Sequence, residues 1–379
     1  MREKTGGVGR ALVACLRENA SAHPGETLLA DALSRTDPQM LLAAARAHRV
    51  SPFVLKALHA SGAHIPSLEA GLGEDQRTLV STQLRTALDL STLGHALDEA
   101  GVPWLVFKGP ALAHLAYARP DRRRYDDLDV LTPPAAFPAA VRALEGAGFA
   151  VLDRNWNLIR REGRGQLHLV HPSGSMVDLH WHLLNRASVR RSFSVDIDEV
   201  FERARVIELD GRRVRTLHAS DTLVHTCLHA ALSGAGRLLW VMDVDGLLTR
   251  EADAWIDIEA RARDWRARSP VAIILERVRR IMGSEIPADL HARLFGSSTR
   301  ARIDRVVDRR WPLETSTSEL SPATVWAEVQ RDRAAELAAA AFRRGTRRPL
   351  TLARGGHGGR AARRRAREPP RRARWGRPG

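Results

Sequence analysis

The spacing of apolar residues changes twice along this chain of 379 residues. It is helical, with apolar positions three or four apart, as far as residue 100, and becomes short or alternating apolar runs from 102 to 217. After residue 218 the helical spacing returns. Strands enclosed between helical segments predict an α+β fold with a small mixed sheet. We expect four regions: N-terminal helices (1–100), an α/β core (101–217), C-terminal helices (218–342) and a basic tail (343–379).

The helical regions carry recognisable starts and stops. In "LLAAARAHRVSPFVLKALHASGA" we predict two short helices separated at Ser51-Pro52, with Ser51 as the cap and Pro52 in the first turn. Ser220 is the expected cap of the first C-terminal helix. Residues 74–100 predict one long amphipathic helix that Gly101 ends. Its apolar positions form two sets: Val80, Leu84 and Leu88, then Leu90, Leu93 and Leu97.

The core shows strand and turn signals. Apolar runs at 102–107 and 128–131 predict buried strands, and helices are expected between them and again at 135–148. Two alternating segments predict hairpins, one over 166–184 around Pro172-Ser173-Gly174 and one over 206–217 at Asp210-Gly211.

The charge of the chain is concentrated at its end. The net charge is +15, but residues 343–379 hold 14 arginines and one acid, which leaves about +2 for the rest of the chain. This segment is rich in Gly and Pro and has few apolar residues, so we expect it to be disordered. A solvated polyelectrolyte is the favoured interpretation, with non-specific nucleic acid contact as the alternative.

Two further features bear on where the protein works. Cys15 and Cys227 are the only cysteines, so neither a disulfide framework nor a Cys-based zinc site is expected. No apolar run approaches the ~20 residues of a membrane-spanning helix, and "MREKTGGVGR" lacks the apolar core of a signal peptide. We therefore expect a cytoplasmic protein without a membrane partner.

Asp127 and Asp129 lie two residues apart on a predicted strand. Side chains at positions i and i+2 of a strand point to the same face, so these two carboxylates can hold Mg²⁺ jointly. Spacing alone is weak evidence, because two other pairs share it. Asp243 and Asp245 fall on a predicted helix, where such side chains diverge, and Asp196 and Asp198 precede a helix that they would cap.

A second feature lies upstream of this strand. Lys108-Gly109 ends an apolar strand and precedes a helix beginning at Pro110, so backbone N–H groups and an ammonium would meet at one point. Lys108 is also one of only three lysines against 56 arginines. The turn has the character of a phosphate-binding site, although such turns often carry Gly for geometry alone.

The third feature is Asp178, in the middle of a predicted strand between Val177 and Leu179. A carboxylate there is costly to bury unless it is paired or binds a metal. Asp178 and His180 share one strand face, whereas Val177 and Leu179 share the other.

Taken in order, these features resemble the DNA polymerase β-like nucleotidyltransferase superfamily. Within it the chain is most similar to the bacterial group called nucleotidyltransferase family proteins. The segments that carry the likeness are "FKGPAL", "RRRYDDLDVL" and "VDLHW", and it extends to "ARAHRVSPFVLKAL" and "LVHTCLHAALSGAGRLLWVMDVDGLL". The resemblance covers about residues 40–280 and implies a nucleotidyltransferase-type sheet.

The resemblance also implies residue roles. Asp127, Asp129 and Asp178 would be the catalytic, metal-binding carboxylates, and Lys108 with Gly109 would hold the triphosphate. The arginine of the family would be Arg123 or Arg124. The implied reaction is attack of an acceptor hydroxyl on a nucleoside triphosphate, with Mg²⁺ or Mn²⁺ as cofactor. The acceptor is left open among a small molecule, a peptide, a protein and a tRNA end.

Two rival hypotheses remain at this point. His180 and His182 share a strand face, and His225 and His229 lie four apart on a predicted helix, which suits a zinc hydrolase. His229 can instead border the acceptor pocket or pack in the core, and His180 also lies on the acceptor side. The second rival is a non-catalytic regulator on the same fold that binds nucleotide, or RNA through its tail. The three acidic positions argue against it.

Overall fold

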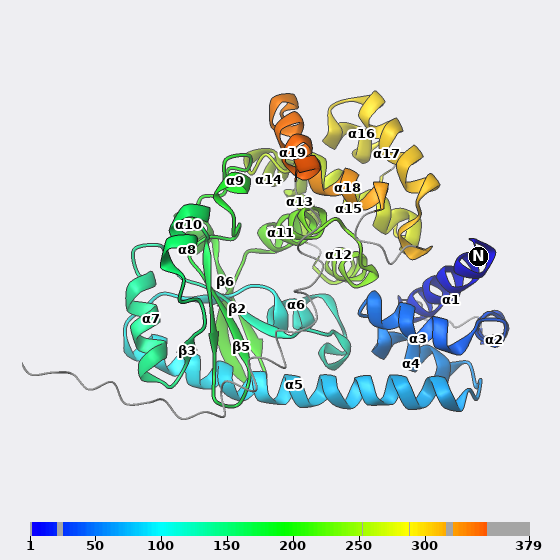
Figure 1. The fold of residues 1–379 in the computed structure, drawn as a ribbon, viewed down its shortest axis with the longest axis horizontal. Helices are drawn as coiled ribbons and strands as arrows, with labels where there is room; N and C mark the ends of the chain where they lie inside the picture. Colours follow the sequence, from blue (N-terminus) through cyan, green and yellow to red (C-terminus); the bar gives the residue numbers. More distant parts are fainter. Residues whose placement is uncertain (1, 21–25, 252, 288, 316–320, 347–379) are drawn as a thin grey trace, which may run out of the picture.

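The structure is a computed structural model that describes residues 2–20, 26–251, 253–287, 289–315 and 321–346. The sheet domain, on the left of Figure 1, lies beside an N-terminal group of helices on the right and beneath a C-terminal group, and one long helix runs beneath both the sheet and the N-terminal group. The predicted α+β class with a small mixed sheet is confirmed. Of the predicted tail, 343–346 belong to the last helix and 347–379 lie outside the described residues.

Five helices form the N-terminal region: α1 (Arg2–Ala20), α2 (Glu26–Ser34), α3 (Pro38–Ala47), α4 (Ser51–Ala60) and α5 (Pro66–Glu99). The break between α3 and α4 is where the sequence predicts it, and Pro52 stands in the first turn of α4. The cap prediction at Ser51 is wrong. Val50 occupies the N-cap position, and the Ser51 hydroxyl donates to Asp75 Oδ2 at 2.8 Å instead.

Helix α5 is longer than predicted, and only one of its two apolar stripes is buried. It begins at Pro66, and Gly101 follows its end with a φ of +62°, as expected for a glycine stop. Leu90, Leu93 and Leu97 are buried, whereas Val80, Leu84 and Leu88 are exposed. Positions 88 and 90 are about 200° apart around a helix, so the two stripes face opposite ways and the sheet covers one of them.

The core places five of its strands in one sheet with the order β1-β2-β5-β4-β3, and its last two strands form a separate two-stranded sheet. Only β2 and β5 are parallel; the other neighbours are antiparallel. The elements are β1 (Leu105–Val106), α6 (Gly109–Ala116), β2 (Asp127–Leu131), α7 (Phe137–Gly146), β3 (Ala150–Val151), α8 (Trp156–Glu162), β4 (Gln166–Val170), β5 (Met176–His180), α9 (Ala187–Arg190) and α10 (Ile197–Arg203), with a 3₁₀ turn at Pro120–Arg122.

The two predicted hairpins are confirmed, but the first predicted strand is shorter than expected. β4 and β5 pair around the Pro172-Ser173-Gly174 turn, and β6 (Arg205–Leu209) pairs with β7 (Arg212–Thr216). Asp210 and Gly211 both have positive φ, as a tight hairpin turn requires. Of 102–107, only Leu105–Val106 pairs, since Pro103 lacks the N–H that a ladder needs.

The C-terminal region consists of α11 (Ala219–Leu232), α12 (Leu238–Arg250), α13 (Asp253–Ile256), α14 (Ile258–Asp264), α15 (Arg268–Met282), α16 (Leu290–Phe295), α17 (Ser298–Arg310), α18 (Pro322–Val329) and α19 (Ala334–Thr346), with a 3₁₀ turn at Leu313–Thr315. The cap of α11 is His218, whose side chain accepts from the Ser220 N–H, so the prediction of Ser220 is wrong by two positions. None of the described helices is long and apolar enough to cross a membrane.

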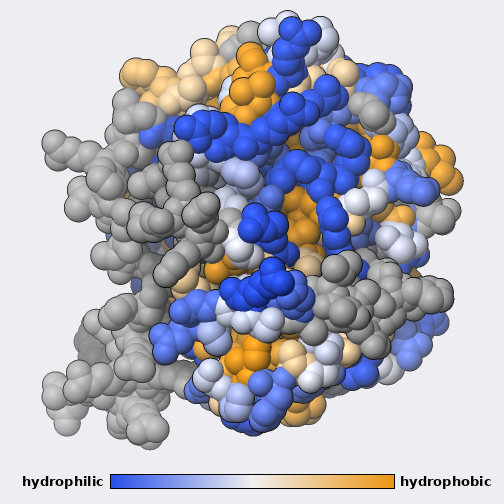
Figure 2. All heavy atoms as spheres, turned by 90° about the vertical axis from the view of Figure 1, so that its right-hand side faces the viewer, coloured by the Kyte–Doolittle hydropathy of each residue, from blue (hydrophilic) through white to orange (hydrophobic). Residues whose placement is uncertain are grey.

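The two faces of the sheet have different surroundings, and this difference positions the site. One face packs in a core with α5 and α7, where Leu128, Val130, Val177 and Leu179 are buried. The strand period places Asp127, Asp129, Asp178 and His180 on the other face, toward the C-terminal helices. Figure 2 shows one outer surface of the molecule, the side that is on the right in Figure 1. This surface is mostly hydrophilic with separate small hydrophobic areas, as is ordinary for a protein.

Close packing of α12 against α6 generates a first prediction. A Cβ added at Gly246 in α12 would lie 2.1 Å from the carbonyl oxygen of Ala116, at the end of α6. Gly246→Ala should therefore destabilise the protein by about 1–3 kcal/mol, because backbone has to move. Gly73→Ala in α5 is the matched control. Its Cβ would meet only the Arg77 guanidinium at 3.6 Å, so we expect about 0.5–1 kcal/mol of stabilisation from the better helix former.

Denaturant unfolding of both variants measures these changes. Equal effects of the two substitutions would contradict the proposed contact between α6 and α12.

Candidate active site

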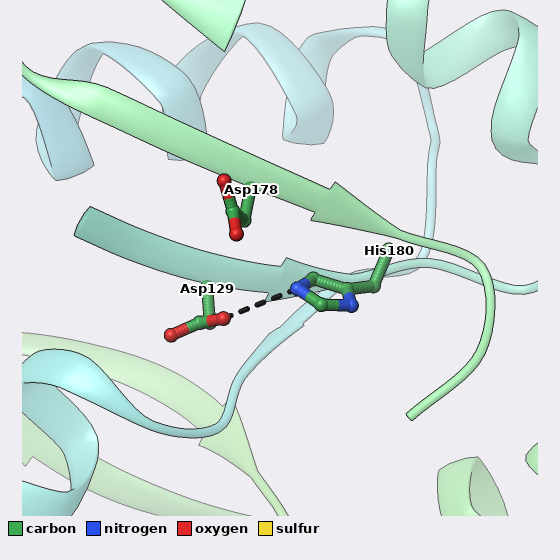
Figure 3. Close-up of side chains that lie close together, drawn as sticks. All are labelled: Asp129, Asp178 and His180. Atoms are coloured by element: carbon green, nitrogen blue, oxygen red, sulfur yellow. Dashed lines mark hydrogen bonds and ion pairs between the residues drawn. The ribbon is translucent and has the colours of Figure 1, made fainter. Parts of the chain in front are cut away.

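Three acidic side chains and one histidine share the face of the sheet that points away from α5. The parallel register of β2 and β5 places Asp129 beside Asp178 and Leu131 beside His180. Asp127 precedes Asp129 by two residues and therefore points the same way. Figure 3 shows Asp129 on β2 opposite Asp178 and His180 on β5. The register of β2 and β5 therefore places these carboxylates on one face of the sheet, as predicted.

Asp129, Asp178 and His180 form a group that could hold a cation. Each offers one ligand atom, and these atoms lie within 4.8 Å of one another. It is the single group of three such ligands found among the described residues. Carboxylate oxygens are the ligands that Mg²⁺ and Mn²⁺ prefer, so the donor set fits a divalent ion. Asp127 stands outside this group but lines the same cavity.

The Lys108-Gly109 turn lies directly against the carboxylates. The Lys108 ammonium is 2.5 Å from Asp129 Oδ1, and His180 Nε2 lies 3.1 Å from the same oxygen. Gly109 begins α6 with a φ of +44°, and a Cβ there would lie 3.0 Å from the Asp127 carbonyl oxygen. Only glycine adopts this conformation easily and leaves room for so close an approach.

The pKa values of Asp127 and Asp178 are raised, whereas that of Asp129 is lowered. Burial raises the pKa of Asp127 to about 7, helped by the charges of Asp129 and Asp178. Burial also raises the pKa of Asp178, and the Asp129 charge adds to it. Burial alone would raise the pKa of Asp129 as well, but Lys108 and His180 outweigh it and hold that pKa low. The site therefore has one carboxylate, Asp129, whose ionised form is favoured beside two, Asp127 and Asp178, that take up a proton more readily than a free aspartate does.

Lys108 remains charged despite its burial. Burial would lower the pKa of its ammonium, yet the carboxylates of Asp129 and Asp127 outweigh that effect and raise it. In this structure the ammonium neutralises the carboxylates. A bound phosphate would have to compete for it.

The two candidate arginines have different positions. Arg123 is buried and donates to both oxygens of Asp243 in α12, at 2.7 and 2.9 Å, and to the Gly109 carbonyl at 3.3 Å. Tyr117 donates to the same carboxylate at 2.7 Å. Arg124 is half-buried and pairs with Asp126 at 3.1 Å. Arg123 thus supports the Lys108-Gly109 turn from behind.

The comparison pairs of aspartates behave as their predicted elements require. Asp243 faces Arg123, whereas Asp245 accepts a hydrogen bond from Ser284, so the two do not share a ligand. Asp196 caps α10 by accepting from the N–H groups of Asp198 and Glu199. The same spacing gives a shared face only on the strand.

The sequence analysis missed a layer of polar side chains on β4. Gln166 donates to Asp178 Oδ2 at 2.8 Å, and His168 Nε2 lies 3.6 Å from Asp178 Oδ1. His168 Nδ1 in turn lies 2.6 Å from Asp153 Oδ2. A signal was present, because a hairpin centred on Ser173 pairs His168 with Asp178, as observed. The position of Asp153 had no such signal.

The histidines of α11 are arranged for packing. His225 lies edge-on to Phe107, with ring centroids 5.2 Å apart, and His229 packs edge-on to Trp240. Burial lowers the pKa of His229 to about 3 and that of His225 well below its usual range. His182 is also separate from the carboxylates, since its Nδ1 accepts from the Leu184 N–H. Among the described residues, none of these three histidines joins a group of three metal ligands.

A cavity of about 450 Å³ opens over the carboxylates. Its wall at the sheet includes Lys108, Asp127, Asp178 and His180, and α11 contributes His225 and His229. The remaining wall comes from α9 and from the segment around α18 and α19. The cavity is large enough for a nucleotide-sized ligand.

Comparison with known proteins agrees with this geometry. No curated protein gives a significant match to the chain. A family model described as "uncharacterised nucleotidyltransferase" matches residues 34–283, which include the sheet, the Lys108-Gly109 turn and helices α11 and α12. Together with the cluster of Asp129, Asp178 and His180, this match supports a general role in nucleotidyl transfer. The chain belongs to the uncharacterised nucleotidyltransferase family.

Proposed function

We propose that the protein transfers a nucleoside monophosphate from a nucleoside triphosphate to an acceptor hydroxyl and releases pyrophosphate. The observation that carries the proposal is that Lys108, Asp127 and Asp178 line one cavity, with Asp129 buried beside them, next to Asp178 in the sheet and paired with Lys108. The acceptor oxygen forms a bond to the α-phosphorus while the bond to the β-phosphate oxygen breaks.

The carboxylates would hold two divalent ions, Mg²⁺ or Mn²⁺. Asp127 and Asp129 lie two residues apart on β2, so their side chains point to the same face of the sheet. Asp178 lies beside Asp129 on the neighbouring strand β5. When bound, such ions neutralise charge on the attacking and leaving oxygens. Burial, and after it the repulsion between neighbouring carboxylates, raises the pKa of Asp127 and Asp178, and bound cations would offset both effects.

The Lys108-Gly109 turn would bind the triphosphate. Gly109 is the first residue of α6, so backbone N–H groups at this helix start face the site. The Lys108 ammonium pairs with Asp129 and also lines the cavity, so it can move from Asp129 to a phosphate oxygen. Arg123 holds this turn through Gly109, so we assign it a positioning role; Arg124 remains the candidate for direct phosphate contact.

Asp178 would take the proton of the acceptor hydroxyl. Its pKa is raised by burial and by Asp129, which suits a carboxylate that must accept a proton. His168 Nε2 lies 3.6 Å from Asp178 Oδ1, and its other nitrogen contacts Asp153. This chain of groups offers the proton a path away from the cavity. His180 orients Asp129, and His229 borders the acceptor side of the cavity.

A purely regulatory nucleotide-binding protein is the second candidate. It would bind a triphosphate through the same turn without releasing pyrophosphate. The buried, mutually repelling carboxylates favour the enzyme, since binding alone does not need three of them.

Loss of one metal-binding carboxylate should abolish turnover and leave the fold intact. The assay incubates the protein with Mg²⁺, each labelled nucleoside triphosphate and a small-molecule cell extract as acceptor source, and measures label transfer and pyrophosphate. We expect Asp129→Asn to reduce the rate by about hundredfold or more, because several kcal/mol of charge stabilisation is lost.

Asp126→Asn is the matched control for this experiment. Asp126 immediately precedes β2 but pairs with Arg49 and Arg124 at the surface. Its substitution should leave the rate within about twofold, as surface pairs contribute little. Failure of the unsubstituted protein to release pyrophosphate from any triphosphate, while still binding one, would favour the regulatory candidate.

Magnesium should stabilise the protein more at high pH than at low pH. The pKa of Asp127 is about 7 in the folded protein and near 3.8 when unperturbed, so the folded state holds an extra proton between these values. This group's contribution to stability therefore falls as pH rises through that window. Mg²⁺ relieves the repulsion above pH 7, whereas below it binding must first displace the proton.

Thermal unfolding with and without Mg²⁺ at about pH 6 and about pH 8 checks this prediction. We expect the larger increase of Tm at pH 8, and Asp127→Asn should remove most of the difference. An increase that is the same at both pH values would contradict the assigned role of Asp127.

A further inference from the structure

The cavity over the carboxylates has a second charged wall at its other end. Arg186, from the segment before α9, and Arg331, Arg343 and Arg344, from the C-terminal segment, line it together with a single acid, Glu328. Figure 1 shows α9 and α19 on the same side of the molecule, above α11. We call these four arginines the basic wall.

Arg331 is the central residue of the basic wall. It is only 4% exposed, and its guanidinium donates to the carbonyl oxygens of Glu328 and Gln330 and lies over the Phe193 ring. Its Nε is buried without a hydrogen-bond partner. Among the described residues it forms no ion pair with a carboxylate, and neither does Arg186. Glu328, the one acid in this wall, pairs with Arg344 at 2.7 Å.

A buried cation without a carboxylate in ion-pair contact is costly, so this arrangement calls for a ligand. Burial and the nearby charge of Arg343 lower the pKa of Arg331 to about 10, although the carboxylates of Glu328 and Glu336, which do not form an ion pair with it, act to raise it. An arginine stays charged at that pKa, and a buried charge normally has a partner of opposite sign. Guanidinium groups bind phosphate and carboxylate oxygens especially well.

The position of the basic wall separates it from the triphosphate turn. The lining of the cavity extends along α11 from His225, which contacts Phe107 beside Lys108, to Ser233, and Thr324 of α18, the helix before Arg331, packs against the next residue, Gly234. Eight residues of helix span about 12 Å. Three of the four arginines also lie beyond residue 283, where the family match ends. The carboxylates and the Lys108-Gly109 turn, which the common reaction needs, lie within the family match. The basic wall lies mostly outside it and therefore suits the acceptor substrate, which differs between enzymes.

We propose that the basic wall binds an anionic group, a phosphate or a carboxylate, on the acceptor substrate. This inference rests on the proposed function and extends it by naming the acceptor class. The acceptor then carries a hydroxyl near Asp178 and its anion near Arg331, at opposite ends of the cavity.

The test is calorimetric titration of inorganic phosphate, and in parallel of succinate, into the full-length protein. The protein is first saturated with Mg²⁺ and an ATP analogue with a methylene bridge between the α- and β-phosphates, which fills the triphosphate site and cannot be cleaved. At least one of the two anions should bind to this complex. Arg331→Gln should weaken that binding by about tenfold or more and leave the affinity for the analogue unchanged.

Two further variants keep the test decisive. Arg333→Gln is the matched control, because Arg333 lies two residues away, is exposed and pairs with Glu336. Arg186→Gln probes the opposite side of the basic wall in case the loss of Arg331 affects folding, and it should weaken anion binding severalfold. Thermal unfolding of each variant verifies that it is folded.

Three results would overturn the inference. These are no binding of either anion, equal loss in Arg331→Gln and Arg333→Gln, or an equal loss of affinity for the ATP analogue, which would assign the basic wall to the triphosphate. Anion binding that Arg331→Gln removes supports the subsite whether or not nucleotidyl transfer is detected. A failure of the proposed function is therefore distinguishable from a failure of this inference.

Discussion

The ion pair between Lys108 and Asp129 allows three carboxylates to share one face of the sheet. Without a cation, buried carboxylates at such short range would repel one another and take up protons. The ammonium at 2.5 Å keeps Asp129 ionised, while Asp127 and Asp178 retain raised pKa values. The carboxylates of the site thus repel one another, and divalent cations can relieve this repulsion. This makes the face of the sheet suited to binding cations.

The C-terminal helices are part of the site as well as a cover for it. Arg123 connects Asp243 in α12 with the carbonyl of Gly109, so α12 determines where the Lys108-Gly109 turn sits. Close contact of Gly246 with the end of α6 brings the same two helices together. Helix α12 thus holds the turn whereas α11 lines the cavity, and changes in these helices can alter substrate choice without touching the carboxylates.

Much of the sheet and its carboxylates could be predicted, because strand side chains alternate and neighbours along the chain stay neighbours in a hairpin. Asp127 and Asp129 follow from that period, and the turn at Ser173 implies the pairing of Asp178 with His168. Arg123 shows the limit of such reasoning. Its place in an arginine run indicated phosphate contact, but the partner that captures it is 120 residues away. The exposed apolar stripe of α5 shows the same limit, because periodicity cannot predict which of two apolar faces of a helix packs against the sheet.

The sequence by itself determined the α+β class, the hairpins, the pairing of acidic residues on strand faces and the family likeness, because each depends on local spacing. Only the tertiary structure decided which charges meet. It joined Lys108 to Asp129 and Arg123 to Asp243, left Arg331 without a carboxylate in ion-pair contact, and brought α19 over the cavity. Such contacts depend on how helices distant in sequence pack against the sheet, and residue spacing carries no information about that packing.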